Sequence, residues 1–210
     1  MKKYPIAEHF LSAQGEGCQQ RKYRSFHGMH FVRMFGCNVK CPWCDSKTAW
    51  EGRPACGMSA EEILGAAKSS RAEIVVITGG EPCIHDLIPI LKLLNSEGIK
   101  AHLETSGTLP ILEREGARFD WVALSPKLLC PPLEKSLLRA DELKLIVSSP
   151  DELNAYLRII SAARASSVWL HPEWGMARDR SLLKALSDFV EKNGGRFRLG
   201  WQLHKNFFVR

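Results

Sequence analysis

The chain has 210 residues, of which 45% are hydrophobic and 25% are charged. This length is enough to bury a sizeable core, and we expect residues 1–210 to form a single domain. The chain has seven cysteines, which is an odd number, and it is long enough to fold without disulfide bonds. Both facts disfavour a secreted disulfide scaffold and favour metal binding or reduced thiols. The net charge of +6 suits an anionic ligand, but the concentrated basic run of a nucleic-acid tail is missing.

The sequence also lacks the marks of membrane insertion and of secretion. No apolar run approaches the roughly 18–20 residues that a membrane span needs. The N-terminal segment MKKYPIAEHF is too polar for the core of a signal peptide. We therefore expect a cytoplasmic protein without membrane contacts.

Short segments rich in β-branched and aromatic residues predict seven strands. In chain order they cover residues 30–34, 73–78, 101–104, 121–124, 143–147, 168–170 and 197–203. Helix signals lie between several of them. Ser59 and Glu62 form the pattern of a capping box, which predicts a helix that runs to about Lys68. Ser149 predicts a second cap of the same kind, with Pro150 at the first helical position.

Two further helices are predicted over 85–96 and 179–192, each followed by a glycine that suits a left-handed helix end. Alternating strands and helices predict an α/β fold with a mostly parallel sheet, because parallel neighbours need crossover connections. Periodicity does not decide whether the sheet is open or closes partway into a barrel.

Three cysteines, Cys37, Cys41 and Cys44, lie within eight residues in what we call the cysteine loop, residues 35–46. A structural zinc site is closed by four ligands, whereas three ligands leave a position open for an outside molecule. Thiolates suit zinc and iron–sulfur clusters alike, so the ligand type alone does not choose the metal. The spacing therefore predicts a metal centre that takes part in chemistry.

Two other interpretations of these cysteines remain open from the residues alone. A closed zinc site could take its fourth ligand from Cys56, His27 or His30, although no second C-x2-C pair is present. Alternatively, the three thiols could simply pack together. Packing alone does not explain why three cysteines lie in one short loop, so the open metal centre is favoured.

The C-x3-C-x2-C spacing, with Trp43 before the last cysteine, resembles the radical S-adenosylmethionine superfamily. The resemblance implies that the three cysteines bind three irons of a [4Fe–4S] cluster. It also implies that S-adenosylmethionine binds the fourth iron through its amino and carboxylate groups. The segment TGGEP at 78–82 follows a predicted strand and resembles the loop that receives the methionine amino group. Glycines let a backbone approach a ligand closely, and Glu81 could offset a cationic amine.

Further motifs resemble a narrower family, the 7-carboxy-7-deazaguanine synthases. They are QGEG at 14–17, FVR at 31–33, CDS at 44–46, ETSG at 104–107, SPK at 125–127, ELK at 142–144 and QLHK at 202–205. The resemblance implies conversion of 6-carboxy-5,6,7,8-tetrahydropterin to 7-carboxy-7-deazaguanine, by ring contraction with loss of ammonia, on the route to queuosine. It further implies an abbreviated partial (β/α) barrel, a homodimer and a flavodoxin-type or other electron donor.

The same resemblance assigns binding residues. The substrate site would comprise Ala13, Gln14, Gly15, Glu16, Arg33, Thr78 and His204. The S-adenosylmethionine site would comprise Trp43, Cys44, Asp45, Gly80, Glu81, Ser125, Pro126 and Lys127. Mg²⁺ would bind the hydroxyl of Ser46 and the substrate carboxylate, since hard oxygen donors suit this ion. The radical derives from the cofactor, so no side chain is predicted to be catalytic.

The substrate assignments also make physical sense. A pterin with a carboxylate needs a cation and groups that pair with its edge of donors and acceptors. Arg33 supplies the cation, and Gln14 and Glu16 supply pairing groups.

The chain departs from the family pattern at a few positions. Residues 18–28 form a longer and more basic segment than usual, for which a solvated hairpin is favoured over contact with nucleic acid. His171 stands where glutamine is common, and Leu203 replaces a common threonine. The thiols that match no ligand position are interpreted as spare; these are Cys18, Cys56, Cys83 and Cys130.

Two other functions would be compatible with parts of the sequence. An activase of glycyl-radical enzymes would share the cysteine loop, but it has no reason to carry the QGEG motif. A zinc-stabilised RNA-binding module would need zinc in place of iron and sulfide.

Overall fold

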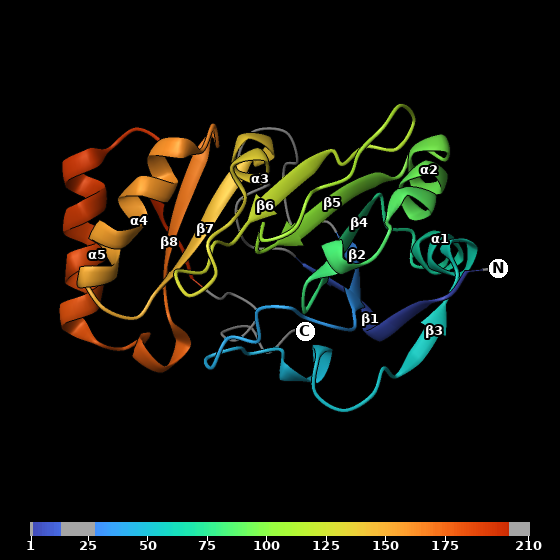
Figure 1. Ribbon diagram of the computed structural model, residues 1–210, viewed down its shortest axis with the longest axis horizontal. Coiled ribbons are helices and arrows are strands. Elements are labelled where there is room, and N and C mark those ends of the chain that lie inside the picture. The colour runs from blue at the N-terminus through green and yellow to red at the C-terminus, as the bar shows by residue number, and fades with distance from the viewer. Residues whose placement is uncertain (1, 14–27, 202–210) are drawn as a thin grey trace.

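The computed structural model describes residues 2–13 and 28–201. Within these residues the strands form one sheet with the order β3-β1-β2-β4-β5-β6-β7-β8-β9 (Figure 1). The strands are β1 (Tyr4–Ala13), β2 (Gly28–Met34), β3 (Cys56–Met58), β4 (Ile74–Gly79), β5 (Lys100–Thr105), β6 (Trp121–Leu124), β7 (Glu142–Val147), β8 (Ser167–Pro172) and β9 (Phe197–Leu199). β1 pairs antiparallel with both its neighbours, whereas every pair from β2 to β9 is parallel.

The predicted α/β fold with a mostly parallel sheet is confirmed. The described strands leave the sheet open, because β3 and β9 lie at opposite edges and do not pair with each other. The helices are α1 (Ala60–Ser69), α2 (Ile88–Ser96), α3 (Glu134–Arg139), α4 (Asp151–Ala162) and α5 (Arg180–Asn193). In Figure 1, α1 and α2 lie beside the N-terminal strands, and α4 and α5 lie at the opposite end of the sheet. None of the described helices is long and apolar enough to cross a membrane.

Two of the strands were missed by the sequence prediction. β1 contains Pro5 near its start, and the polar residues Glu8 and His9 interrupt its apolar pattern. Proline inside a run argues against a strand except at an edge or at the beginning, which is where Pro5 lies. β3 has only three residues and is defined by its pairing with β1 rather than by its own composition.

The predicted helix caps were correct in one case and wrong in another. Ser59 Oγ accepts from Glu62 N at 3.2 Å, and Glu62 Oε2 accepts from Ser59 N at 2.6 Å, so the capping box of α1 is confirmed. Ser149 does not cap α4: Pro150 is the N-cap and no side chain bonds to it. The carboxylate of Glu152 instead accepts from Ser148 N at 2.7 Å, which places the local capping contact one residue earlier.

The two predicted helix ends are confirmed by positive φ angles. Gly98 after α2 has φ +70°, and Gly194 after α5 has φ +54°. The start of α2 was predicted too early, since α2 begins at Ile88. Residues 82–84 form a separate short 3₁₀ helix, η2 (Pro82–Ile84), and His85 bonds through Nε2 to Phe35 O at 2.9 Å.

The helices cover one face of the sheet through two apolar clusters. One cluster joins α1 and α2 to strand residues that include Val32, Ile77 and Leu103, and the other joins α3, α4 and α5 to residues that include Leu145 and Leu170. Because side chains alternate across a strand, the residues next to these positions face the other side of the sheet, which we call the inner face. Its polar members next to these positions are Arg33, Thr78, His102, Glu104, Lys144 and His171.

His171, where the chain departs from the family pattern, is fully buried on the inner face. The backbone at Gly200 approaches its ring so closely that a Cβ there would lie 2.1 Å from His171 Nε2. This approach explains why a glycine is required at position 200.

The pKa values of two buried histidines, His30 and His102, make the free energy of unfolding depend on pH. Burial lowers the pKa of His102 from 6.5 to about 4; Asp120 opposes this effect, and Lys100 adds a smaller decrease. Burial and the neighbouring His9 also lower the pKa of His30. The unfolded chain therefore binds more protons than the folded chain below pH 6.5, so the free energy of unfolding falls as the pH drops from there. For His102 alone the loss by pH 5 is roughly 2 kcal/mol.

Urea unfolding at pH 7 and at pH 5 measures this loss. His102→Gln removes the titrating group, so the difference between the two pH values should shrink in the variant. An equal difference in the variant and the wild type would contradict the assignment to His102.

Candidate active site

The cysteine loop, residues 35–46, follows β2 directly and is fixed at its start by two backbone hydrogen bonds. Phe35 N donates to Pro5 O at 2.9 Å, and Gly36 N donates to Ala49 O at 2.7 Å. The loop is therefore tied both to β1 and to the short 3₁₀ helix η1 (Lys47–Ala49). These contacts hold it at the end of the parallel strands where their carboxyl termini meet, the usual place for an active site in such a sheet.

The three cysteines of the loop lie at different depths. Cys41 is buried, whereas Cys37 and Cys44 are partly exposed. Backbone N–H groups at 39 and 40 donate to Cys37 Sγ at 3.4 and 3.5 Å, and the indole N–H of Trp50 donates to Cys44 Sγ at 3.5 Å. Donors of this kind stabilise thiolates and tune an iron–sulfur cluster that thiolates bind.

The chemistry of this donor set fits a cluster better than a closed zinc site. In the described ranges, no group of three or more His, Cys, Asp or Glu side chains is arranged to hold one metal ion. His30, one candidate fourth ligand, already contacts Ser70 Oγ at 3.1 Å and His9 at 3.3 Å, and Cys56 is exposed on β3. A [4Fe–4S] cluster binds each thiolate on a separate iron, so its ligands need not converge on one point.

The TGGEP loop packs directly against the cysteine loop. Glu81 N donates to Gly36 O at 2.8 Å, and Gly80 N donates to Met34 O at 3.3 Å. A Cβ on Gly80 would lie 2.3 Å from Gly36 O and 2.7 Å from Cys37 Cβ. The glycine is thus needed for contact between the two loops, whereas the sequence had suggested only close approach to a ligand.

The carboxylate of Glu81 is fully buried and surrounded by four donors. Oε1 accepts from Cys83 N at 3.0 Å and from Thr105 Oγ1 at 2.7 Å. Oε2 accepts from Ser106 N at 2.8 Å and from Ser106 Oγ. Glu81 therefore joins the loop after β4 to the loop after β5, and its predicted contact with the cofactor stays a prediction.

Glu81→Gln is expected to destabilise the fold by roughly 1–3 kcal/mol, because the amide nitrogen brings a donor against the existing donors. Thermal unfolding of the cluster-free protein measures the change. Glu115→Gln, an exposed glutamate on the loop before β6, is the matched control and should stay within about 0.5 kcal/mol of the wild type. Equal stability of the two variants would contradict the conclusion that Glu81 stabilises the fold by joining the loops after β4 and β5.

The segment after β6 faces the cysteine loop. Ser125 N donates to Thr105 O at 2.8 Å, and Lys127 Nζ donates to Ser125 Oγ at 2.6 Å. Burial lowers the pKa of Lys127, and the negative charges of Cys41 and Asp45 are among the groups that oppose this effect. Burial raises the pKa of the Cys41 thiol, and Lys127 is the chief opposing group. This mutual influence indicates that the ammonium lies near the thiols.

The structure brings the residues predicted for S-adenosylmethionine onto neighbouring loops. They are Trp43, Cys44 and Asp45 on the cysteine loop, Gly80 and Glu81 after β4, and Ser125, Pro126 and Lys127 after β6. The ring of Trp43 is 40% exposed, so it does not belong to the core. Ser46, predicted for Mg²⁺, donates from Oγ to Asp45 Oδ1 at 3.2 Å.

Two of the predicted substrate residues lie side by side on the inner face, where Arg33 pairs with Thr78 in register between β2 and β4. Each has an acidic partner that the site prediction missed. Arg33 Nε donates to Glu8 Oε1 at 2.7 Å, and Thr78 Oγ1 donates to Glu104 Oε2 at 2.9 Å. The ETSG motif contained a signal for Glu104, whereas Glu8 lies on the strand that the prediction missed.

Of the other predicted substrate residues, only Ala13 lies within the described ranges. Ala13 ends β1 opposite Gly28 of β2. Gln14, Gly15, Glu16 and His204 lie outside the described residues, as do the basic segment 18–27 and Leu203.

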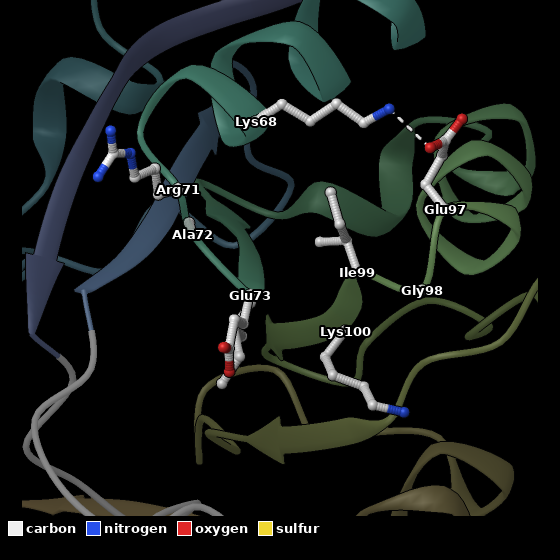
Figure 2. Close-up of a pocket in the computed structure, with 9 residues that line it drawn as sticks. Lys68, Arg71, Ala72, Glu73, Glu97, Gly98, Ile99 and Lys100 are labelled. Atoms are coloured by element: carbon white, nitrogen blue, oxygen red, sulfur yellow. Dashed lines mark hydrogen bonds and ion pairs between the residues drawn. The ribbon is translucent and has the colours of Figure 1, made fainter.

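A hollow of about 570 Å³ lies at the other end of the sheet, where β4 and β5 begin. Figure 2 shows Lys68 reaching Glu97 beside it, and their Nζ and Oε2 atoms are 2.6 Å apart. Arg71 and Lys100 point in different directions, so the cations do not converge on one ligand position (Figure 2). This hollow contains none of the predicted site residues.

Comparisons with known proteins agree with this geometry. The sequence matches the Radical SAM superfamily over residues 31–167. It is 35% identical over 208 residues to a 7-carboxy-7-deazaguanine synthase of Synechocystis sp., a match that covers 99% of this chain and 94% of that relative. The structure is similar to QueE from Escherichia coli with a TM-score of 0.76, 29% identity and 94% coverage of both chains. Streptococcus suis SuiB bound to S-adenosylmethionine shares the fold, with a TM-score of 0.56 and 14% identity over 79% of this chain and 48% of SuiB.

The cysteine loop, the TGGEP loop and the open parallel sheet are those of the radical S-adenosylmethionine superfamily, in which a [4Fe–4S] cluster and S-adenosylmethionine act together. The 35% identity over 208 residues narrows the assignment from the superfamily to one family. The chain belongs to the 7-carboxy-7-deazaguanine synthase family.

Proposed function

We propose that this protein converts 6-carboxy-5,6,7,8-tetrahydropterin to 7-carboxy-7-deazaguanine. The observation that carries the proposal is the contact between the cysteine loop and the TGGEP loop, beside an inner face that bears a cation and carboxylates. The full-length identity to a relative of this name supports the substrate assignment.

Cys37, Cys41 and Cys44 would hold the cluster, and the loops after β4 and β6 would hold S-adenosylmethionine beside it. When bound, the cluster would supply one electron to S-adenosylmethionine, which would then supply a carbon radical able to take hydrogen from C6 of the pterin. The chain's own residues bind, orient and shield the reactants, because the cofactors carry the difficult chemistry. Lys127 contributes positive charge next to the thiols.

The inner face offers complementary groups for the pterin. Arg33 can bind its carboxylate, while Glu104 can accept from the donor edge of the ring, with Thr78 as a neighbouring hydroxyl. Gln14, Glu16 and His204 are proposed to complete this pocket. Glu8 holds the Arg33 guanidinium at 2.7 Å and so orients it toward the ligand.

Mg²⁺ is proposed to bind Ser46 together with the substrate carboxylate. The hydroxyl of Ser46 and the carboxylate of Asp45 offer hard oxygen atoms on the same turn, which suits this ion. A bound Mg²⁺ would fix the position of the carboxylate and steer the rearrangement.

We also propose a homodimer, an external one-electron donor of the flavodoxin type and a cytoplasmic location. Each reduction of the cluster requires an electron from outside the chain, and thiols stay reduced in the cytoplasm. Light scattering in solution tests the dimer directly.

The function is tested by anaerobic incubation of the reconstituted protein with S-adenosylmethionine, reductant, Mg²⁺ and carboxytetrahydropterin. We expect 7-carboxy-7-deazaguanine to form, and to form more slowly when Mg²⁺ is removed. If S-adenosylmethionine is cleaved while the pterin stays unchanged, the superfamily assignment stands and the substrate is wrong.

A further inference from the structure

A continuous row of side-chain hydrogen bonds connects the buried carboxylate of Glu81 to the cysteine loop. Ser106 Oγ bonds to Glu81 Oε2, and Thr108 Oγ1 lies 2.9 Å from Ser106 Oγ. At the far end, Asn38 Nδ2 donates to Thr108 Oγ1 at 3.0 Å. We call Asn38, Thr108, Ser106 and Glu81 the polar relay.

The direction of the bonds in the polar relay follows from the protons available and from the distances. The carboxylate of Glu81 is an acceptor in all its contacts, so Ser106 gives it its only hydroxyl proton. Ser106 Oγ then accepts from the hydroxyl of Thr108, whose distance to Ser106 Oγ of 2.9 Å is shorter than its 3.5 Å to Asn38 Oδ1. Thr108 Oγ1 in turn accepts from Asn38 Nδ2. All three donors therefore point toward the carboxylate, and hydrogen bonds aligned in this way strengthen one another.

The cysteine loop needs such support from outside. Lys40 has φ +52°, a left-handed conformation that costs a non-glycine residue about 1–2 kcal/mol. In the same turn, the backbone N–H groups at 39 and 40 donate to Cys37 Sγ. Strained backbone persists only where its surroundings hold it. Asn38 is the residue of this turn that the polar relay holds, and it follows Cys37 directly.

We propose that Asn38 and Thr108 are positioning residues for the cluster: they hold the turn that directs backbone donors at Cys37. The inference rests on the proposed function only in that the three cysteines bind a [4Fe–4S] cluster. Neither residue belongs to the predicted binding sites, and neither needs to touch the cofactor or the substrate. They act through the sulfur ligand that they orient, as outer groups around metal sites do.

The test compares Thr108→Val and Asn38→Ala with Thr108→Ser, which keeps the hydroxyl. Anaerobically reconstituted proteins are challenged with an iron chelator, and the electron paramagnetic resonance spectrum of the reduced cluster is recorded. We expect cluster loss about tenfold faster in Thr108→Val and Asn38→Ala, with altered spectra. Thr108→Ser should resemble the wild type, as should Thr48→Val, an exposed threonine near the cysteine loop that lies outside the polar relay.

The double variant supplies a further criterion. If both residues act through one contact, Asn38→Ala combined with Thr108→Val loses its cluster no faster than the faster single variant. Additive rates, wild-type spectra in the two single variants, or failure of Thr108→Ser to restore them would overturn the inference. Asn38 is exposed, so Asn38→Ala carries the test if Thr108→Val fails to fold.

Pterin conversion by the wild type is scored separately. A wild type that holds its cluster but leaves the pterin unchanged overturns the proposed substrate and leaves the polar relay intact. A wild type that binds no iron and sulfide overturns both.

Discussion

Replacing Cys41 with alanine is expected to abolish the cluster and the formation of product. Cys41 is the most deeply buried of the three thiols, and alanine leaves the cluster with two protein ligands. Loss of an outer group around a metal costs about 10–100-fold in affinity or activity, so loss of a direct ligand should exceed this range. Iron and sulfide content after anaerobic reconstitution, followed by product formation, measures both effects.

Cys56→Ala is the matched control for this experiment. Cys56 is also free, but it is exposed on β3 and outside the cysteine loop. We expect its variant to keep a full complement of iron and sulfide and wild-type turnover. A Cys41→Ala protein that retains its cluster, or a Cys56→Ala protein that loses it, would show that the ligands were assigned wrongly.

Replacing Gly80 with alanine is expected to displace the cysteine loop. The added Cβ would lie 2.3 Å from Gly36 O and 2.7 Å from Cys37 Cβ, and neither atom belongs to a flexible side-chain end that could move aside. Overpacking of this kind costs about 1–3 kcal/mol of stability. A displacement of about 1 Å at the reacting centre can lower a rate about 100-fold. Thermal unfolding and product formation therefore both test the prediction.

Gly65→Ala makes the same chemical change where there is room for it. Gly65 lies within α1, and a Cβ there meets no atom within 4 Å. Alanine is favoured over glycine in a helix by about 1 kcal/mol, so this variant should be slightly more stable and fully active. If Gly80→Ala matches Gly65→Ala in stability and rate, the close contact of the two loops is not required.

The sequence predicted the parts of the fold that local patterns control. β4 is an almost continuous apolar run, and the capping box at Ser59 satisfies its donors within one turn of α1. β1 escaped prediction because Pro5, Glu8 and His9 interrupt its apolar pattern, so only its pairing with β2 and β3 identifies it as a strand. The cap predicted at Ser149 failed for a local reason, since Glu152 bonds to Ser148 instead.

The same distinction applies to the site. Spacing within one loop was enough to predict Cys37, Cys41 and Cys44 as a group. The partners of Arg33 and Thr78 come from other strands, so only the assembled sheet reveals Glu8 and Glu104 beside them. The burial of Glu81 among four donors likewise depends on the loop after β5. The roles of Gln14, Glu16 and His204 stay predictions.

Among the described residues, the open sheet has two edges whose backbone groups could pair with another molecule. At each edge lies a strand of only three residues, β3 on one side and β9 on the other. A strand this short offers few free N–H and C=O groups as a template, which is one way in which natural sheets avoid edge-to-edge aggregation. The described sheet can thus stay open and still resist association with other molecules through its edges.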